Sequence, residues 1–285
     1  MSVVVTGATG HLGRLVVESL LERGLPAGEI TATGRDTTKL ADLAELGVAT
    51  ARADFEDPAS LRAAFAGADT LLLVSGSEVG ERARQHRNAI EAAKEAAVGH
   101  IAYTSVLRAD RSALSLAPEH KATEQILAES GLPHTLLRNG FYSEVYVNQL
   151  EQAREHGAVV GSAGEGLLSS ASRADYAEAA AVVLLDPAAH AGAVYELAGD
   201  QAWTYTDLAA AIGEVLGREV AYNDLNEEQH RKVLTGAGLD EATAEFVVGL
   251  DTSAREGELY GEPGHLSKLI GRPTTPIVDT LRAGA

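Results

Sequence analysis

The sequence contains no cysteine among its 285 residues. Disulfide bonds, thiolate nucleophiles and zinc sites built from cysteine are therefore excluded. No apolar run approaches the ~20 residues that a membrane-spanning helix needs, and the first residues lack the basic-then-apolar order of a secretory signal. We therefore expect a globular protein in the cytoplasm, with no membrane partner and no metal site.

Positive charge is also scarce, with 23 Lys and Arg against 41 Asp and Glu, and the formal net charge is −18 at pH 7. Such a surface repels nucleic acids and anionic lipids, so we expect neither as a partner. Aromatic residues make up only 5% of the chain, but hydrophobic residues make up 45%. The chain is therefore long and apolar enough for one large domain, or for a domain with an appended lobe.

The first thirteen residues predict a turn that binds a dinucleotide. Val3 to Val5 is typical of a buried strand, and the apolar positions of residues 12–21 repeat at helical spacing. Gly7, Gly10 and Gly13 lie between them, where glycine allows a tight turn and a close approach of the backbone to a pyrophosphate. Three glycines alone are a weak signal, but their place between strand and helix is the expected context. We therefore expect the phosphates to bind Gly7, Ala8, Thr9, Gly10, His11, Leu12 and Gly13.

Predicted strands and helices alternate through the first half of the chain. The patterns indicate strands at residues 29–33, 47–52, 69–74, 100–105 and 133–138, with helices at 80–97 and 118–130 among them. This alternation is typical of the α/β class, and specifically of a doubly wound parallel sheet of the Rossmann type.

Beyond residue 139 this alternation is looser. Residues 157–166 are rich in glycine and indicate a loop, whereas the patterns further on indicate helices at 173–185 and 206–217, a strand at 193–197 and two helices within 226–256. We expect residues 1–150 to form an NAD(P)-binding domain. Residues 151–285 would then form a smaller C-terminal α/β lobe that binds substrate and is interwoven with the first domain.

In a doubly wound sheet, ligands bind beyond the carboxyl ends of the strands. Arg35 follows the second predicted strand, where NAD-specific proteins carry an acidic residue, so its charge suits the 2′-phosphate of NADP. A solvated surface arginine would show the same pattern. Asp54 and Phe55 follow the third strand, where the carboxylate either accepts from the adenine amino group or caps the next helix. We expect NADPH as the cofactor, with NADH possible but weaker.

The next three strands also end in candidate cofactor contacts. They are Ser75, Gly76 and Ser77, then Tyr103, Thr104 and Ser105, and finally Asn139, Gly140, Phe141 and Tyr142. The first group is small enough to pass close to the ribose and pyrophosphate, and the other two would lie near the nicotinamide. Ordinary loop and strand preferences also explain these residue types.

The helix expected after the fifth strand lacks the tyrosine that conventional short-chain dehydrogenases pair with a lysine four residues later. Lys121 in this helix can reach the nicotinamide ribose, and His120 can donate a proton, because histidine titrates near neutral pH. Tyr103 can orient a substrate carbonyl. An exposed, charged helix start explains Lys121 and His120 equally well. These three residues are the catalytic candidates.

Phe141, Tyr142 and Tyr146 form an aromatic cluster in a chain with few aromatic residues. Together they would make a wall for a flat, apolar substrate. Packing in the core is the alternative for each ring taken alone.

Several longer strings in the sequence resemble one protein family. They are GATGHLG at residues 7–13, SGSEVG at 75–80, QHRN at 85–88, IAYTS at 101–105, TLLRNGFYSE at 135–144, SRADYA at 172–177, YELAGD at 195–200 and LSKLIGRPTT at 266–275. Together they resemble the type 2 NAD(P)H:quinone oxidoreductases, which are atypical short-chain dehydrogenases of the NmrA-like group, near the triphenylmethane reductases. The resemblance covers essentially the whole chain.

This resemblance implies an NADPH-binding Rossmann domain with a small C-terminal lobe, and reduction of a quinone or a similar flat, electron-poor acceptor without flavin or metal. It implies cofactor contacts at residues 7–13, Arg35, 75–77 and 139–142, and a helix lysine at or near Lys121. Some NmrA-like relatives are redox sensors that bind a dinucleotide and regulate a protein partner, so this second function remains open. A nucleotide-sugar epimerase would need the absent Tyr/Lys pair.

Overall fold

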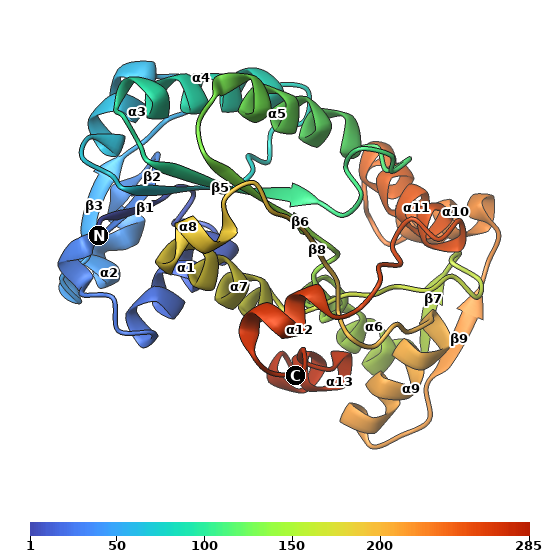
Figure 1. Ribbon diagram of the computed structural model, residues 1–285. Coiled ribbons are helices and arrows are strands. Elements are labelled where there is room, and N and C mark those ends of the chain that lie inside the picture. Colours follow the sequence, from blue (N-terminus) through green and yellow to red (C-terminus); the bar gives the residue numbers. More distant parts are fainter.

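The computed structural model describes all 285 residues, and its centre is a parallel sheet of seven strands in the order β3-β2-β1-β4-β5-β6-β8 (Figure 1). The strands are β1 (Val3–Val5), β2 (Ile30–Gly34), β3 (Ala49–Arg52), β4 (Thr70–Leu73), β5 (His100–Val106), β6 (His134–Asn139) and β8 (Val194–Leu197). All neighbouring strands run parallel. The strand order reverses between β1 and β4, which confirms the predicted doubly wound sheet.

Helices cover both faces of this sheet (Figure 1). The first group is α1 (His11–Glu22), α2 (Ala41–Glu45), α7 (Arg173–Leu185), α8 (Pro187–His190) and α12 (His265–Ile270), and the second is α3 (Pro58–Phe65), α4 (Arg82–Glu95) and α5 (Ala117–Ser130). Each group closes a separate apolar core against the sheet. The inner strands are buried for this reason, and β1 consists of the continuous apolar run Val3–Val5. The edge strands β3 and β8 are more exposed.

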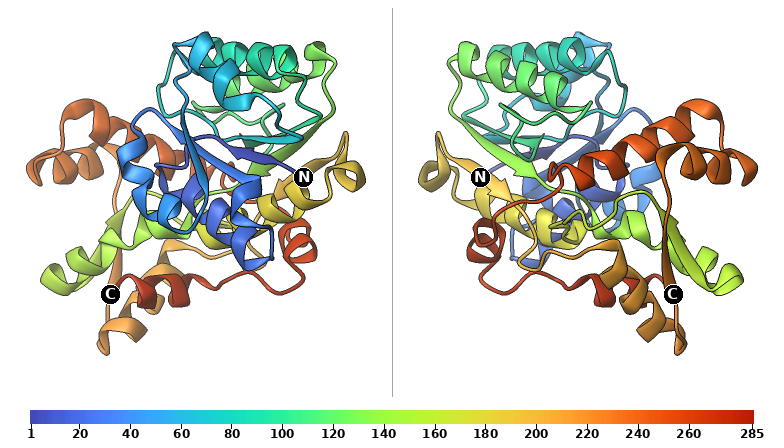
Figure 2. Two further views of the ribbon diagram at one scale, coloured as in Figure 1. Left: turned by 90° about the vertical axis from the view of Figure 1, so that its left-hand side faces the viewer. Right: turned by 90° about the vertical axis from the view of Figure 1, so that its right-hand side faces the viewer.

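A smaller unit lies beside the carboxyl end of the sheet. It contains the two-stranded parallel sheet of β7 (Ala158–Gly161) and β9 (Ala221–Asp224), with helices α6 (Asn148–His156), α9 (Tyr205–Leu216), α10 (Glu227–Gly236), α11 (Glu241–Arg255) and α13 (Ile277–Ala283). A third apolar core fills it. Figure 2 shows α10 and α11 standing out from the side of the molecule. The shorter 3-10 turns are η1 (Ala27–Glu29), η2 (Thr37–Leu40) and η3 (Ser143–Tyr146).

The second half of the chain contributes to both units. Helix α7 packs against α1, and β8 pairs with β6 in the main sheet, whereas β7 and β9 lie in the smaller unit. That the chain divides at residue 150 into an NAD(P)-binding domain and a substrate-binding lobe stays a proposal. No helix in the structure combines the length and the apolar composition that crossing a membrane requires.

The predicted elements agree with the structure except in the smaller unit. Helix α7 has the predicted bounds, and α10 and α11 are the two helices expected within residues 226–256. The prediction of a loop at 157–166 was wrong for residues 158–161, which form β7, whereas residues 162–166 are a loop as predicted. Strand β9 was not predicted. It has four largely exposed residues, so neither an apolar run nor an alternating pattern marks it.

Candidate active site

A cavity of about 530 Å³ lies at the carboxyl ends of the main-sheet strands, where the strand order reverses. Residues at the ends of six strands, β1 to β6, or in the segments that follow them make up most of its lining. The lining residues are Thr6, Gly7, Thr9, Gly10, His11, Leu12, Gly13, Thr33, Gly34, Arg35, Ala53, Asp54, Phe55, Val74, Ser75, Gly76, Ser77, Glu78, Arg82, Gln85, Ser105, Val106, Leu116, His120, Asn139, Gly140, Phe141, Tyr142, Val145 and Arg173. Its position is that of the ligand crevice of doubly wound folds.

The turn between β1 and α1 can be formed only with glycine at two of its positions. Gly7 has φ +63°, in the left-handed region. A Cβ atom on Gly13 would lie 2.5 Å from the carbonyl oxygen of Gly7, so helix and strand could not pack this closely with any other residue there. Ala8 lies behind the turn with no exposed surface, and its N–H donates to the Thr33 oxygen at 2.8 Å. The turn is therefore held against β2 and its outer side faces the cavity.

The N-terminus of α1 offers free hydrogen-bond donors to this cavity. No side chain caps the helix at Gly10, and its first turn contains no acidic residue. The first helical hydrogen bond runs from the Arg14 N–H to the Gly10 oxygen, so the N–H groups of His11, Leu12 and Gly13 have no helical acceptor. With the positive end of the helix dipole, they make a site for a phosphate group.

At one end of the cavity, charged side chains are exposed. Arg35 follows β2 and its Nη1 donates to Glu78 Oε1 at 2.9 Å, although the two side chains are 69% and 47% exposed. Asp54 and Phe55 also line this end. The Asp54 carboxylate already accepts from Arg52 at 2.9 Å and from the Glu56 N–H at 3.0 Å, which leaves it less free to bind a base.

The turn of residues 75–77 lines the middle of the cavity and is held from behind. The Ser75 N–H donates to Thr104 Oγ1 at 2.9 Å, and the Gly76 N–H donates to His86 Nε2 at 3.0 Å. Thr104 is buried and does not line the cavity, so it supports the turn. Because His86 Nε2 accepts, its Nδ1 carries the hydrogen and donates to Thr123 Oγ1 at 3.0 Å.

At the other end, a buried histidine and a buried tyrosine form a pair. Tyr103 Oη lies 2.8 Å from His120 Nδ1, and His120 lines the cavity whereas Tyr103 is completely buried. Burial lowers the pKa of His120 to about 3, with a further contribution from the charge of Arg82. Burial also raises the pKa of Tyr103. Both side chains are therefore neutral at pH 7.

Ser105, next to this pair, belongs to a buried ionic network. Its hydroxyl donates to Glu124 Oε1 at 2.6 Å, and Arg138 binds both oxygens of Glu124 at 2.9 and 2.7 Å. Arg138 also donates to Asp110 and Glu196, each at 2.8 Å. Since the serine hydrogen is committed to Glu124, Ser105 faces the cavity as a hydrogen-bond acceptor.

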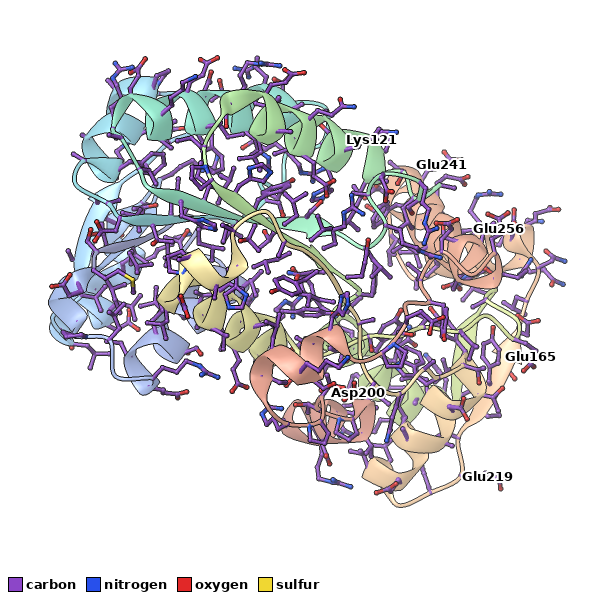
Figure 3. All side chains as sticks on the ribbon, viewed as in Figure 1. Lys121, Glu165, Asp200, Glu219, Glu241 and Glu256 are labelled. Carbon is purple, nitrogen blue, oxygen red and sulfur yellow. The ribbon has the colours of Figure 1, made fainter.

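Five predicted site residues do not line the cavity: Ala8, Tyr103 and Thr104 lie just behind it, and Lys121 and Tyr146 lie elsewhere. Lys121 is on the exposed side of α5, where its Nζ donates to the Asp110 oxygen at 3.1 Å (Figure 3). Tyr146 is in the core of the smaller unit, edge-on to Trp203 with ring centroids 4.8 Å apart. It does not line the cavity: its ring lies behind Phe141, with centroids 6.2 Å apart, and also packs against Trp203 and Tyr205. The structure thus places Lys121 and Tyr146 away from the position that the sequence analysis assigned to them.

The apolar wall of the cavity instead contains Phe141 and Tyr142 together with Val106, Leu116 and Val145. The sequence analysis missed the last three, because isolated aliphatic residues carry no distinctive signal. It also missed Glu78 and Arg173, although both lie within the strings that resemble the family.

Arg173, at the first position of α7, is the one lining residue from beyond residue 150. Its guanidinium carbon lies 4.8 Å from the centroid of the Tyr142 ring, and an ion pair joins it to Glu144 at 3.6 Å. These contacts fix the ring of Tyr142 at the edge of the cavity.

These residues fit a dinucleotide. The turn between β1 and α1 has no room for a Cβ atom at Gly13, and the N-terminus of α1 has free N–H donors. Asn139, which lines the cavity and is only 5% exposed, has an Oδ1 atom with no hydrogen-bond partner. A buried acceptor of this kind needs a donor from a ligand or a water, and a nicotinamide carboxamide has one.

This sequence is similar to those of known proteins. The family model described as the NmrA-like family matches residues 1–269. Quinone oxidoreductase 2 of Escherichia coli strain K12 is 48% identical over 279 residues, which are 98% of this chain and 97% of that protein.

Solved structures share the fold over the same length. The crystal structure of the NADPH-dependent quinone oxidoreductase QOR2 of E. coli complexed with NADPH matches with a TM-score of 0.94 at 48% identity, and the match covers 99% of both chains. The triphenylmethane reductase of Citrobacter sp. complexed with NADP(H) matches with a TM-score of 0.95 at 37% identity over 100% of both chains.

Proposed function

The chain belongs to the NmrA-like family, and from that premise we propose that it is an NADPH-dependent reductase that transfers hydride to quinones or similar flat, electron-poor acceptors. The observation that carries the proposal is the cavity, which joins a glycine turn and a free helix N-terminus to an apolar wall. The fold and the identity to an NADPH-dependent quinone oxidoreductase support the same activity.

In this proposal the cofactor lies along the ends of the strands. The N–H groups of residues 11–13 bind the pyrophosphate, Arg35 binds the 2′-phosphate, and the turn of residues 75–77 passes beside the ribose. Asn139 accepts from the nicotinamide carboxamide. When bound, NADPH supplies a hydride from C4 of its nicotinamide ring.

The acceptor lies against Phe141 and Tyr142, whose rings are large, flat and partly buried. This wall excludes water from one side of the acceptor and orients it for the transfer, so that proximity supplies much of the rate. The hydride and one proton convert a quinone to a hydroquinone. Water can supply the proton, so the reaction needs neither flavin nor metal.

His120 orients the acceptor oxygen. The hydroxyl of Tyr103 donates to Nδ1 of the neutral imidazole, and the ring hydrogen is then on Nε2. A hydrogen bond from Nε2 to the acceptor carbonyl stabilises the negative charge that develops there during hydride transfer. Lys121 has no role in this proposal, because its Nζ donates to the backbone carbonyl oxygen of Asp110 outside the cavity.

The test is the decay of NADPH absorbance with purified protein, with and without a simple benzoquinone or naphthoquinone. We expect quinone-dependent decay far above the uncatalysed rate, unchanged by a chelator and without flavin absorbance in the protein. NADH should be oxidised less efficiently. Tight NADPH binding with no turnover of any acceptor would favour the redox-sensor alternative, in which a protein partner is regulated.

We place this activity in the cytoplasm, where the NADPH pool is kept reduced, and fractionation of cells that express the chain tests the location. We further propose that residues 151–285 act as a lobe that supports the acceptor side of the cavity through Arg173. That nucleic acids and membranes are not partners stays a prediction from the net charge of −18.

A further inference from the structure

The ion pair between Arg35 and Glu78 joins two elements across the cavity. Arg35 follows β2, and Glu78 lies in the loop between β4 and α4. Strand β1 lies between β2 and β4 in the sheet, so the pair spans two strand spacings, or about 10 Å of sheet. The strands that precede its two partners thus flank β1, after which the glycine turn begins.

Glu78 is held in this position by a second contact. Gln85 of α4, which is only 3% exposed, donates from Nε2 to Glu78 Oε2 at 2.8 Å and to Glu56 Oε1 at 2.9 Å. The loop is fixed at both ends, since the Gly76 N–H donates to His86 and the Gly80 N–H donates to Glu119. One carboxylate oxygen is thus bound by Gln85 while the other binds Arg35.

The carboxylate of Glu78 is paired with the guanidinium of Arg35, which is the group that we propose binds the 2′-phosphate of NADPH. A phosphate and a carboxylate both bind arginine through paired oxygens, so they compete for Arg35. The ion pair is exposed and contributes little to stability, so a phosphate can displace Glu78. After displacement, Gln85 still holds the carboxylate near the new dianion, and the two repel each other. NADH carries no 2′-phosphate, so it neither competes with Glu78 for Arg35 nor is repelled by the Glu78 carboxylate in this way.

We propose that Glu78 is a specificity-determining residue that competes with the 2′-phosphate of NADPH for Arg35, and so limits both the affinity for NADPH and the preference over NADH. The inference rests on the proposed function, because it requires Arg35 to bind this phosphate. In this inference, Glu78 weakens the binding of the natural cofactor. Weaker binding favours release of the oxidised cofactor after each turnover.

The experiment measures the dissociation constants of NADPH, NADH and 2′-AMP by titration calorimetry, without any quinone. The variant is Glu78→Gln, which keeps the contact with Gln85 possible but removes the charge. The matched control is Glu81→Gln, since Glu81 is an exposed carboxylate three residues further on that pairs with Arg84 and does not line the cavity. Thermal melts of each variant establish that it is folded.

At low ionic strength we expect Glu78→Gln to bind NADPH and 2′-AMP about three- to fivefold more tightly, which corresponds to the measured strength of exposed ion pairs. NADH should bind within a factor of about two of the unaltered protein, and Glu81→Gln should change none of the three. In about 0.5 M salt the gain should shrink, because screening weakens exposed charges. In an Arg35→Gln background the gain should also shrink, since no cation remains for which to compete.

Unchanged or weaker NADPH binding in Glu78→Gln would overturn the inference, because Glu78 would then be neutral or would position Arg35 for the phosphate. An equal gain for NADH would also overturn it, since the effect would be one of general charge. If the unaltered protein binds no NADPH, the proposed function fails as well. If the unaltered protein binds NADPH tightly and Glu78→Gln has the same dissociation constant, this inference is refuted and the proposed function is not.

Discussion

The two ends of the cavity differ in how their charges are held. At one end, Arg35 and Glu78 meet as an exposed pair with one buried support. At the other, Arg138 and Glu124 are about nine-tenths buried and belong to a network that also holds Ser105. Exposed pairs in water are weak and exchangeable, whereas buried pairs are costly to break. The exposed end can therefore adjust to a ligand, and the buried end keeps a fixed geometry for the reaction.

Breaking the buried end should have the largest effect. In Arg138→Met, the carboxylates of Glu124 and Glu196 lose their guanidinium partner, and Glu124 is left charged and buried. We expect the free energy of unfolding to fall by about 3–5 kcal/mol, measured by urea denaturation. The contrasting variant Arg35→Gln should change it by less than about 1 kcal/mol. Equal losses would remove the distinction between the two ends.

Acid should also act on two buried histidines beside the cavity. Burial lowers the pKa of His86 and of His120 to about 3 in the folded chain, below the ordinary value of about 6.5 in the unfolded chain. The unfolded state therefore binds more protons between these values, and stability falls as the pH falls from about 6.5 towards 3. Each histidine should contribute up to ~1.4 kcal/mol per pH unit.

Urea denaturation at a series of pH values measures this slope. His120→Gln should reduce it by the share of one histidine. The same slope in His120→Gln and in the unaltered chain would mean that His120 already titrates normally in the folded state.

At the exposed end, Arg35→Gln removes the proposed partner of the 2′-phosphate. A hydrogen bond to a charged group is worth about 1.5–3 kcal/mol, so the dissociation constant of NADPH should rise roughly ten- to a hundredfold. Binding of NADH should change little. Titration with both cofactors measures the change, and an equal loss for NADH would show that Arg35 acts on the fold or on the shared part of the cofactor.

A smaller effect on catalysis is expected from Tyr103→Phe, which removes the hydroxyl that we propose donates to Nδ1 of His120 and so keeps the ring hydrogen on Nε2. We expect kcat to fall about tenfold, which is less than the loss of a direct general acid or base would cause, because Tyr103 acts only through His120. The dissociation constant of NADPH should not change, because Tyr103 does not line the cavity. A variant that loses NADPH affinity but keeps kcat would assign Tyr103 to packing.

Much of the cofactor side of the cavity was predictable from short stretches of sequence. The glycine turn and the residues that follow the strands are local features, and the rule that ligands bind at the carboxyl ends of strands places them together. All of these predicted cofactor residues except Ala8, Tyr103 and Thr104 line the cavity. Those three lie behind the lining: Ala8 is on the inner side of the glycine turn, and Tyr103 and Thr104 come before the last two residues of β5, which do line it.

The acceptor side was less predictable. Phe141, Tyr142 and Tyr146 are close in sequence, yet the 3-10 turn η3 directs the last of them into another core. Lys121 and His120 are adjacent, but only His120 faces the sheet, because neighbouring residues on a helix point in different directions. Single residues on short turns and helix starts lack a periodic signal strong enough to fix their direction.

The sequence by itself determined the doubly wound fold, the dinucleotide turn and the acidic, cysteine-free character of the chain, because periodicity, glycine spacing and composition act locally. The tertiary structure decided which polar groups meet. Arg35 and Glu78 are 43 residues apart, Tyr103 and His120 are 17 apart, and Arg138 and Glu196 are 58 apart. Such pairs form only after parallel strands align and bring the elements that follow them to one edge of the sheet, so no local pattern encodes them.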